Sequence, residues 1–93
     1  MAWNYFCQEL RFIEVKARIK GALTVTVSKN EILHALNSPK EFILAIVEVD
    51  GQNTKTIYLK EPFKGLQKPS FMEVNRSFKI EELIHNSEVV YQD

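Results

Sequence analysis

Residues 11 to 18 have the sequence Arg11-Phe12-Ile13-Glu14-Val15-Lys16-Ala17-Arg18. Its alternating side chains predict a β-strand over Leu10 to Ala17 with one buried face. Because side chains two residues apart share one face of a strand, Glu14 and Lys16 are expected on the same side. A carboxylate that can hold a divalent metal, next to an amine that can orient a water or steady a phosphate, is half of a metal-dependent phosphodiesterase site. The stretch therefore predicts a strand that carries half of such a site.

The segments that follow this strand predict a hairpin and a helix. After a turn at Gly21, residues 23–28 alternate again, and the economical pairing is a β-hairpin with the first strand. Ser28 and Glu31 have the spacing of a capping box, which predicts a helix from Lys29 to Asn37. Pro39 ends this helix.

The second half of the chain predicts the centre of a sheet and a final helix. Residues 42–47 form an uninterrupted apolar run, typical of a strand covered on both faces. Residues 54–59 are expected to pair with it through a loop over 50–53. Further on, residues 71–74 predict a short strand and Ser77 a cap for a helix carrying Ile80, Leu83 and Ile84. The fold class is therefore α/β, with α+β as the alternative: a mixed β-sheet with flanking helices.

Composition limits the possible classes of protein. The 93 residues are 45% hydrophobic, which suits one domain over residues 1–93 with a single modest core. Twelve basic side chains balance twelve acidic ones, so any nucleic-acid binding must come from a local patch. The lone Cys7 excludes an internal disulfide framework and predicts a cytoplasmic protein. The longest apolar run, residues 42–47, is too short to span a bilayer, so no membrane association is expected.

Several blocks of the sequence together resemble a known family. They are Arg11 to Lys16, Thr26, Asn30-Glu31 at a helix start, the strand over 42–47, and Glu61-Pro62-Phe63. Their order and spacing over residues 10–84 resemble the NO VEIN C-terminal domain family, within the restriction-endonuclease-like PD-(D/E)XK nuclease superfamily. The resemblance implies a restriction-endonuclease-like fold and a domain that handles DNA beside a helicase or ATPase, or within restriction and defence proteins.

The resemblance also implies roles for three residues. Glu14 and Lys16 match the E-x-K element, in which the acid binds Mg²⁺ and the lysine positions the attacking water or stabilises the developing charge. Glu31 matches the acid that opens the following helix, although its capping role explains the residue without chemistry. A bare acid-x-lysine triplet also arises by chance, as a cross-strand ion pair on a solvated strand face.

One acid of the superfamily pattern is missing upstream of Glu14. Glu9 is too near in sequence to lie on a separate strand, and Asn4 stands where an aspartate is expected. Three explanations stay open: a degenerate site, a fragment of a longer protein, or an acid supplied by a partner. The sequence thus predicts a DNA-processing or DNA-binding module that resembles a Mg²⁺-dependent phosphodiesterase, as a degenerate or truncated nuclease would. The alternative is a non-catalytic module that binds a protein partner or pairs with itself as a homo-oligomer.

Basic residues outside the triplet could contact nucleic acid. Arg11, Arg18 and Lys20 extend the E-x-K strand into a basic strip. Lys60, Lys64 and Lys68 are interleaved with aromatic residues around the long loop, Tyr58, Phe63 and Phe71. Simple solvation near the strand ends is the competing explanation for the first group, and lysines on a solvated loop are the competing explanation for the second.

Overall fold

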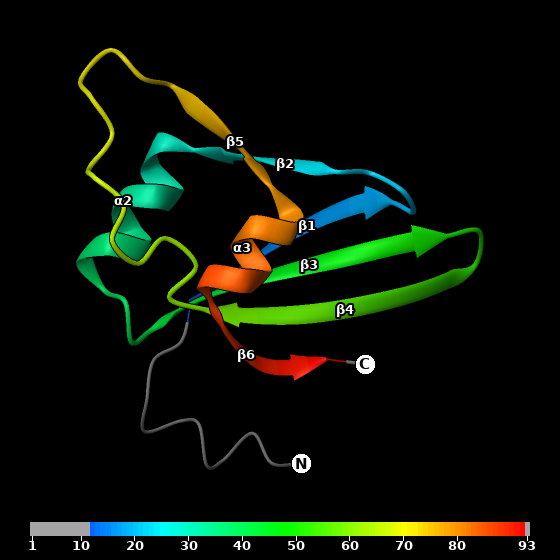
Figure 1. Ribbon diagram of the computed structural model, residues 1–93. Helices are drawn as coiled ribbons and strands as arrows, with labels where there is room; N and C mark the ends of the chain where they lie inside the picture. Colours follow the sequence, from blue (N-terminus) through cyan, green and yellow to red (C-terminus); the bar gives the residue numbers. More distant parts are fainter. Residues whose placement is uncertain (1–11, 93) are drawn as a thin grey trace.

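The computed structural model describes residues 12–92, which form six strands and two helices (Figure 1). In chain order they are β1 (Phe12–Ile19), β2 (Thr24–Ser28), α2 (Lys29–Asn37), β3 (Phe42–Asp50), β4 (Asn53–Lys60), β5 (Asn75–Lys79), α3 (Ile80–Asn86) and β6 (Glu88–Gln92). A four-stranded sheet has the order β1-β3-β4-β6, and β2 pairs with β5 in a second, two-stranded sheet. None of the described helices is long and apolar enough to cross a membrane.

The two sheets and the helices form layers around one core. In Figure 1, α2, α3 and the β2-β5 sheet lie over one face of the four-stranded sheet. Within that sheet β1 is parallel to β3, whereas β3-β4 and β4-β6 are antiparallel. The mixed sheet with flanking helices confirms the predicted fold class.

The core lies between the layers and is built mainly from alternate residues of β3. Phe42, Leu44 and Ile46 face the second layer, where they meet apolar side chains from β2, α2, β4 and α3. Ile43 and Ala45 are buried as well, although they point to the opposite face. This confirms that residues 42–47 are the doubly covered strand at the centre of the sheet. The β3-β4 hairpin and the bounds of α2 are also confirmed.

The predicted hairpin between the first two strands is wrong. β1 pairs in parallel with β3, with Phe12 opposite Phe42, and β2 pairs in antiparallel fashion with β5. Gly21, at φ +90°, turns the chain out of the first sheet and into the second. β2 and α2 then form the crossover that parallel strands require, and β2 buries Val25 and Val27 against the core.

On β1 the face with the apolar side chains Ile13 and Val15 is more exposed than the face with the charged ones. Ile13 and Val15 are 50% and 57% exposed, whereas Glu14 and Lys16 are partly buried. Glu14 lies opposite Leu44 on β3, so it faces the second layer, where α2 lies. The polar side chains of β1 therefore point into the interlayer space.

The last part of the chain also departs from the prediction. Residues 71–74 are not a strand; β5 begins at Asn75, and Ser77 lies within it. The final helix has Lys79 at its N-cap position, with no side-chain cap. The serine pattern failed because Ser77 pairs with Thr26 across the β2-β5 ladder instead of preceding the helix.

Candidate functional site

Three side chains meet where β1 passes the first turn of α2. The Lys16 Nζ lies 2.9 Å from Glu31 Oε1 and 4.0 Å from Glu14 Oε2. It also donates a hydrogen bond to Glu31 Oε2 at 3.2 Å. Exposed fractions are 22% for Lys16, 25% for Glu14 and 19% for Glu31. The structure thus brings together all three residues predicted as catalytic.

The fold fixes each member of this cluster separately. The β1-β3 ladder places Glu14 and Lys16 on one face, opposite Leu44 and Ile46. The capping box at the start of α2 fixes Glu31: the Ser28 backbone N–H donates to Glu31 Oε1 at 2.8 Å, and the Glu31 N–H donates to Ser28 Oγ at 3.2 Å. Capping and the ion pair with Lys16 therefore use the same carboxylate, so the structural and chemical interpretations of Glu31 are compatible.

The two carboxyl groups have pKa values shifted in opposite directions. Burial raises the pKa of Glu14, the neighbouring Glu31 raises it further, and Lys16 only partly opposes this. Burial also acts to raise the pKa of Glu31, but the Ser28 N–H and the Lys16 ammonium outweigh it and lower that pKa. Two carboxyl groups whose environments separate their pKa values are suited to different roles, one proton-binding and one anionic.

The donor set suits a hard cation only in part. Glu14 and Glu31 offer carboxylate oxygens, and Mg²⁺ is often held by one or two carboxylates together with waters and substrate phosphates. Within residues 12–92 no third histidine, cysteine or acidic side chain joins them to complete a metal cluster. The acid that the resemblance requires is therefore missing from the described part of the chain as well.

The basic residues predicted to bind nucleic acid do not form one patch. Lys20 pairs with Asp50 at 3.5 Å, at the far end of β1. Lys60 lies opposite Ile43, on the other face of the sheet from Glu14. Lys64 is exposed in the turn after β4. Arg11 lies outside the described residues.

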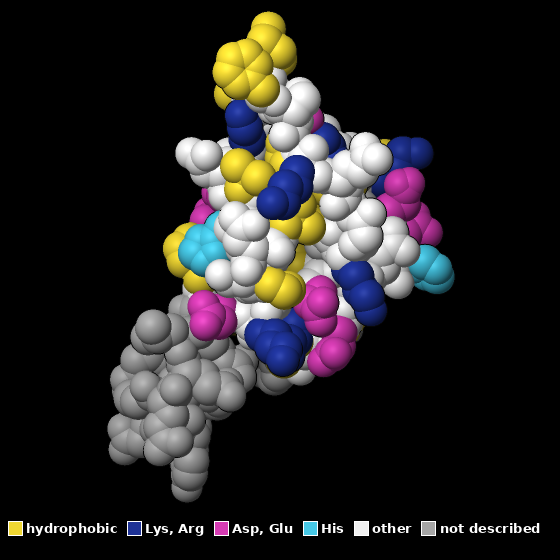
Figure 2. Space-filling view, turned by 90° about the vertical axis from the view of Figure 1, so that its left-hand side faces the viewer, with side chains coloured by type: hydrophobic (Ala, Val, Ile, Leu, Met, Phe, Trp, Pro, Cys, Tyr) yellow, Lys and Arg dark blue, Asp and Glu magenta, His cyan; other side chains and the backbone are white. Residues whose placement is uncertain are grey.

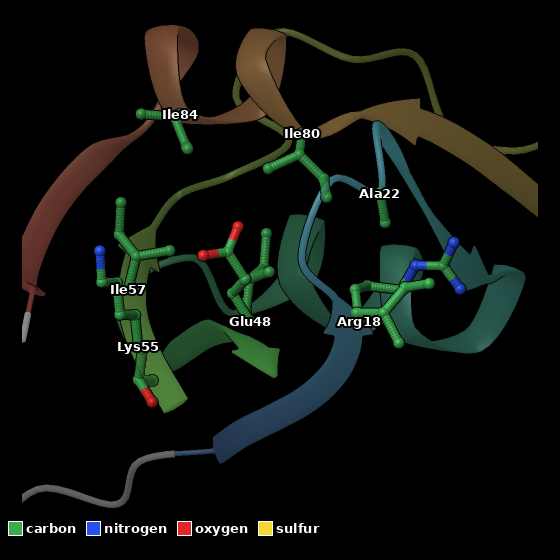
Figure 3. Close-up of a pocket in the computed structure, with 10 residues that line it drawn as sticks. Arg18, Ala22, Glu48, Lys55, Ile57, Ile80 and Ile84 are labelled. Carbon is green, nitrogen blue, oxygen red and sulfur yellow. The ribbon is translucent and has the colours of Figure 1, made fainter. Parts of the chain in front are cut away.

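Arg18 shares the face of Lys16, two residues further along β1. It lines a hollow of about 180 Å³ between the four-stranded sheet and α3 (Figure 3). Apolar side chains line it from both sides, Ile57 from β4 and Ile80 and Ile84 from α3. Glu48 stands on β3 between Arg18 and Lys55 in the strand register. In Figure 3 the Arg18 guanidinium points away from the Glu48 carboxylate. Of the predicted basic strip, Arg18 alone among the described residues continues the face that carries the site.

A known protein family matches the part of the chain that carries the candidate site. The sequence model of the family described as Protein NO VEIN, C-terminal, matches residues 6–59. The chain belongs to this family. The matched segment includes β1, β2, α2, β3 and most of β4, and hence all three residues of the acid–lysine cluster. No curated protein and no solved structure matches the chain.

The NO VEIN C-terminal match ends before the long loop, β5, α3 and β6. Sequence reasoning missed Lys29, the first residue of α2, which contacts that loop through its ammonium and its backbone. It did single out Phe71, together with Tyr58 and Phe63. The structure separates these rings, because Phe63 is buried, Tyr58 is half-buried and Phe71 is 88% exposed. Only an exposed ring can stack on a ligand, and the aromatic pattern alone could not distinguish them.

Proposed function

We propose that this chain is a nucleic-acid-processing module that binds a phosphodiester at the Glu14–Lys16–Glu31 cluster. The single observation that carries the proposal is the position of the Lys16 ammonium between two carboxylates from different elements. We further propose that the domain is of the restriction-endonuclease-like, PD-(D/E)XK type, a degenerate or incomplete Mg²⁺-dependent phosphodiesterase. DNA is the proposed substrate, handled beside a helicase or ATPase domain of the same or a neighbouring chain.

Each residue of the cluster has a distinct role in this proposal. Glu14 and Glu31 supply oxygen ligands for Mg²⁺, which would polarise the phosphodiester and activate a water. Lys16 holds that water or steadies the charge that develops on the phosphate. Metal binding needs an ionised Glu14, so the raised pKa of this carboxyl group makes metal affinity increase with pH.

A magnesium titration with a carboxylate variant tests this site. Mg²⁺ should raise the melting temperature of the native chain, because a cation that binds only the folded state stabilises it by mass action. Glu14→Gln keeps the shape of the side chain but removes the ligand charge, so the shift should disappear. Glu48→Gln is the matched control, since Glu48 is also half-buried on an adjacent strand. An equal Mg²⁺ shift in Glu14→Gln would contradict the proposal.

A second candidate function is self-association through β1. Among the described strands β1 pairs only with β3, so it lies at an edge of the sheet. Ile13 and Val15 are half exposed on its outer face, which is unusual for large apolar side chains on a strand edge. The favoured partner is a second copy, because two β1 edges can pair in an isologous manner.

Sedimentation of Val15→Lys tests self-association. The native chain should sediment as a dimer, and the buried charge in Val15→Lys should convert it to a monomer. Thr24→Lys is a control on an exposed position of the other sheet and should leave the dimer intact. A native chain that stays monomeric at high concentration would exclude this function.

A further inference from the structure

The loop between β4 and β5 carries exposed apolar side chains. Phe71, Met72 and Val74 are 88%, 81% and 75% exposed. Figure 2 shows hydrophobic side chains standing out from one end of the molecule, with Lys or Arg side chains beside them. In Figure 1 this loop reaches past the β2-β5 sheet. We call Phe71 and Met72 the loop tip.

The base of the loop tip is held by a defined set of contacts. The Glu73 N–H donates to the Ser70 carbonyl at 3.1 Å, and the Ser70 N–H donates to Glu73 Oε2 at 3.3 Å. Arg76 donates two hydrogen bonds to the Glu73 carboxylate, at 2.6 and 2.8 Å, and these bonds lower the pKa of Glu73. A bidentate pair of this kind fixes geometry. The turn that exposes the loop tip to solvent is therefore held in place by the hydrogen bonds of Glu73 with Ser70 and Arg76.

Lys29 connects the loop tip to the candidate site. Its backbone N–H donates to the Val74 carbonyl at 2.8 Å, and its Nζ donates to the Phe71 carbonyl at 3.3 Å. The same ammonium lies 6.0 Å from the centre of the Phe71 ring. Lys29 is the first residue of α2, and Glu31 follows in the same helical turn. The tip and the acid–lysine cluster are thus fixed to one end of one helix.

We propose that Phe71 is a stacking contact for an unpaired base of the nucleic-acid strand bound at the Glu14–Lys16–Glu31 cluster. This inference rests on the proposed function. It adds that the bound nucleic acid is single-stranded where it meets the loop tip. An exposed ring next to an ammonium suits a nucleotide, because the ring stacks on the base while the cation meets a phosphate. The Lys29 ammonium lies beside the ring, and Lys68 precedes Phe71 by three residues in the same loop, whereas Arg76 is paired with Glu73. The loop tip lies outside residues 6–59, which the family model matches.

Binding of a single-stranded DNA with 2-aminopurine, about 12 nucleotides long, to the full chain tests the contact. Stacking on Phe71 should quench the 2-aminopurine fluorescence. Phe71→Ala should weaken binding about 5- to 100-fold and remove the quenching, the range expected for one base–aromatic stack. Phe71→Trp should retain binding, and Phe71→Leu should behave like alanine, because leucine has no ring. Leu23→Ala removes another exposed apolar side chain, 79% exposed, from the segment between β1 and β2, and should leave binding and quenching unchanged.

The possible outcomes distinguish failure of the stacking contact at Phe71 from failure of the proposed site at the Glu14–Lys16–Glu31 cluster. If Phe71→Ala leaves oligonucleotide binding unchanged while Lys16→Met weakens it, the stacking contact alone is overturned. Binding that depends on Phe71 but not on Lys16 supports the contact and overturns the proposed site. Failure of the native chain to bind the oligonucleotide overturns both. Binding to phosphatidylserine vesicles that Phe71→Leu retains, without oligonucleotide binding, overturns the contact in favour of a membrane anchor.

Discussion

Lys16→Met should destabilise the protein by about 1–3 kcal/mol near neutral pH. The substitution removes the ammonium that lies 2.9 Å from Glu31 and 4.0 Å from Glu14, and it leaves two partly buried carboxylates side by side. Methionine keeps most of the side-chain volume, so the loss measures charge and not packing. Urea unfolding of the native chain and the variant gives the difference in free energy of unfolding.

The destabilisation should depend on pH with a defined sign. Glu14 has a raised pKa, so its contribution to stability is complete below its ordinary value of 4.5 and is lost as pH rises through the folded-state pKa. Glu31 has a lowered pKa, so its contribution is present above 4.5 and is lost as pH falls through its folded-state pKa. Removing Lys16 moves both folded-state pKa values upward. The cost of Lys16→Met should therefore be largest at neutral and alkaline pH and shrink as Glu14 becomes protonated.

Two further variants check the electrostatic origin of this effect. Adding Glu14→Gln to Lys16→Met removes the second charge and should restore much of the lost stability. Lys20→Met is the matched lysine control, because its pair with Asp50 is 67% and 59% exposed and should contribute less than about 1 kcal/mol. A cost for Lys16→Met that is the same at every pH would contradict the electrostatic explanation.

Phe42→Ala should cost about 3–5 kcal/mol, enough to unfold much of a marginally stable domain. Phe42 is fully buried at the start of β3, and its ring lies 5.7 Å from that of Phe12 and 6.3 Å from that of Phe63. Truncation removes these contacts and leaves a cavity that the two layers cannot close. Thermal and urea unfolding followed by circular dichroism measure the loss.

Phe71→Ala is the matched control for Phe42→Ala. It deletes the same ring from an 88% exposed position, so the free energy of unfolding should change by no more than about 0.5 kcal/mol. The same variant is the one expected to weaken oligonucleotide binding. A large loss of stability in Phe71→Ala would mean that the loop tip packs against the protein and is not available to a ligand.

Local patterns predicted local structure well in this chain. The helix predicted from about Lys29 to Asn37 has these bounds in the structure, because its capping box and Pro39 both act within a few positions. The β3-β4 hairpin followed from an apolar run and an alternating run on either side of a short loop. The partner of β1 could not be predicted in this way. Alternation tells which strands exist but not which distant strand completes each ladder, and the nearest candidate, β2, belongs to the other sheet.

In the candidate site, too, the local features could be predicted from the sequence and the long-range contacts could not. The spacing of Glu14 and Lys16 predicted their shared face, but their approach to Glu31 depends on the packing of α2 against the β1-β3 ladder. The sequence predicted one buried face for this strand without showing which one, and the structure leaves Ile13 and Val15 half exposed. Hydrophobicity along one strand does not reveal which face the next layer covers. The loop tip was visible only as one aromatic residue among several, because exposure is set by the fold.

The separation between paired strands has a consequence for how the protein folds. β3 and β4 are joined by a tight turn and can pair early. The pairings of Phe12 with Phe42 and of Val25 with Phe78 instead join residues that are separated by much longer segments of chain. Closing such loops costs chain entropy before any contact compensates for it, so these pairings form slowly. The strand that carries Glu14 and Lys16 is therefore expected to dock after the central hairpin. A chain released from the ribosome would acquire its acid–lysine cluster only in the last steps of folding, when both layers close.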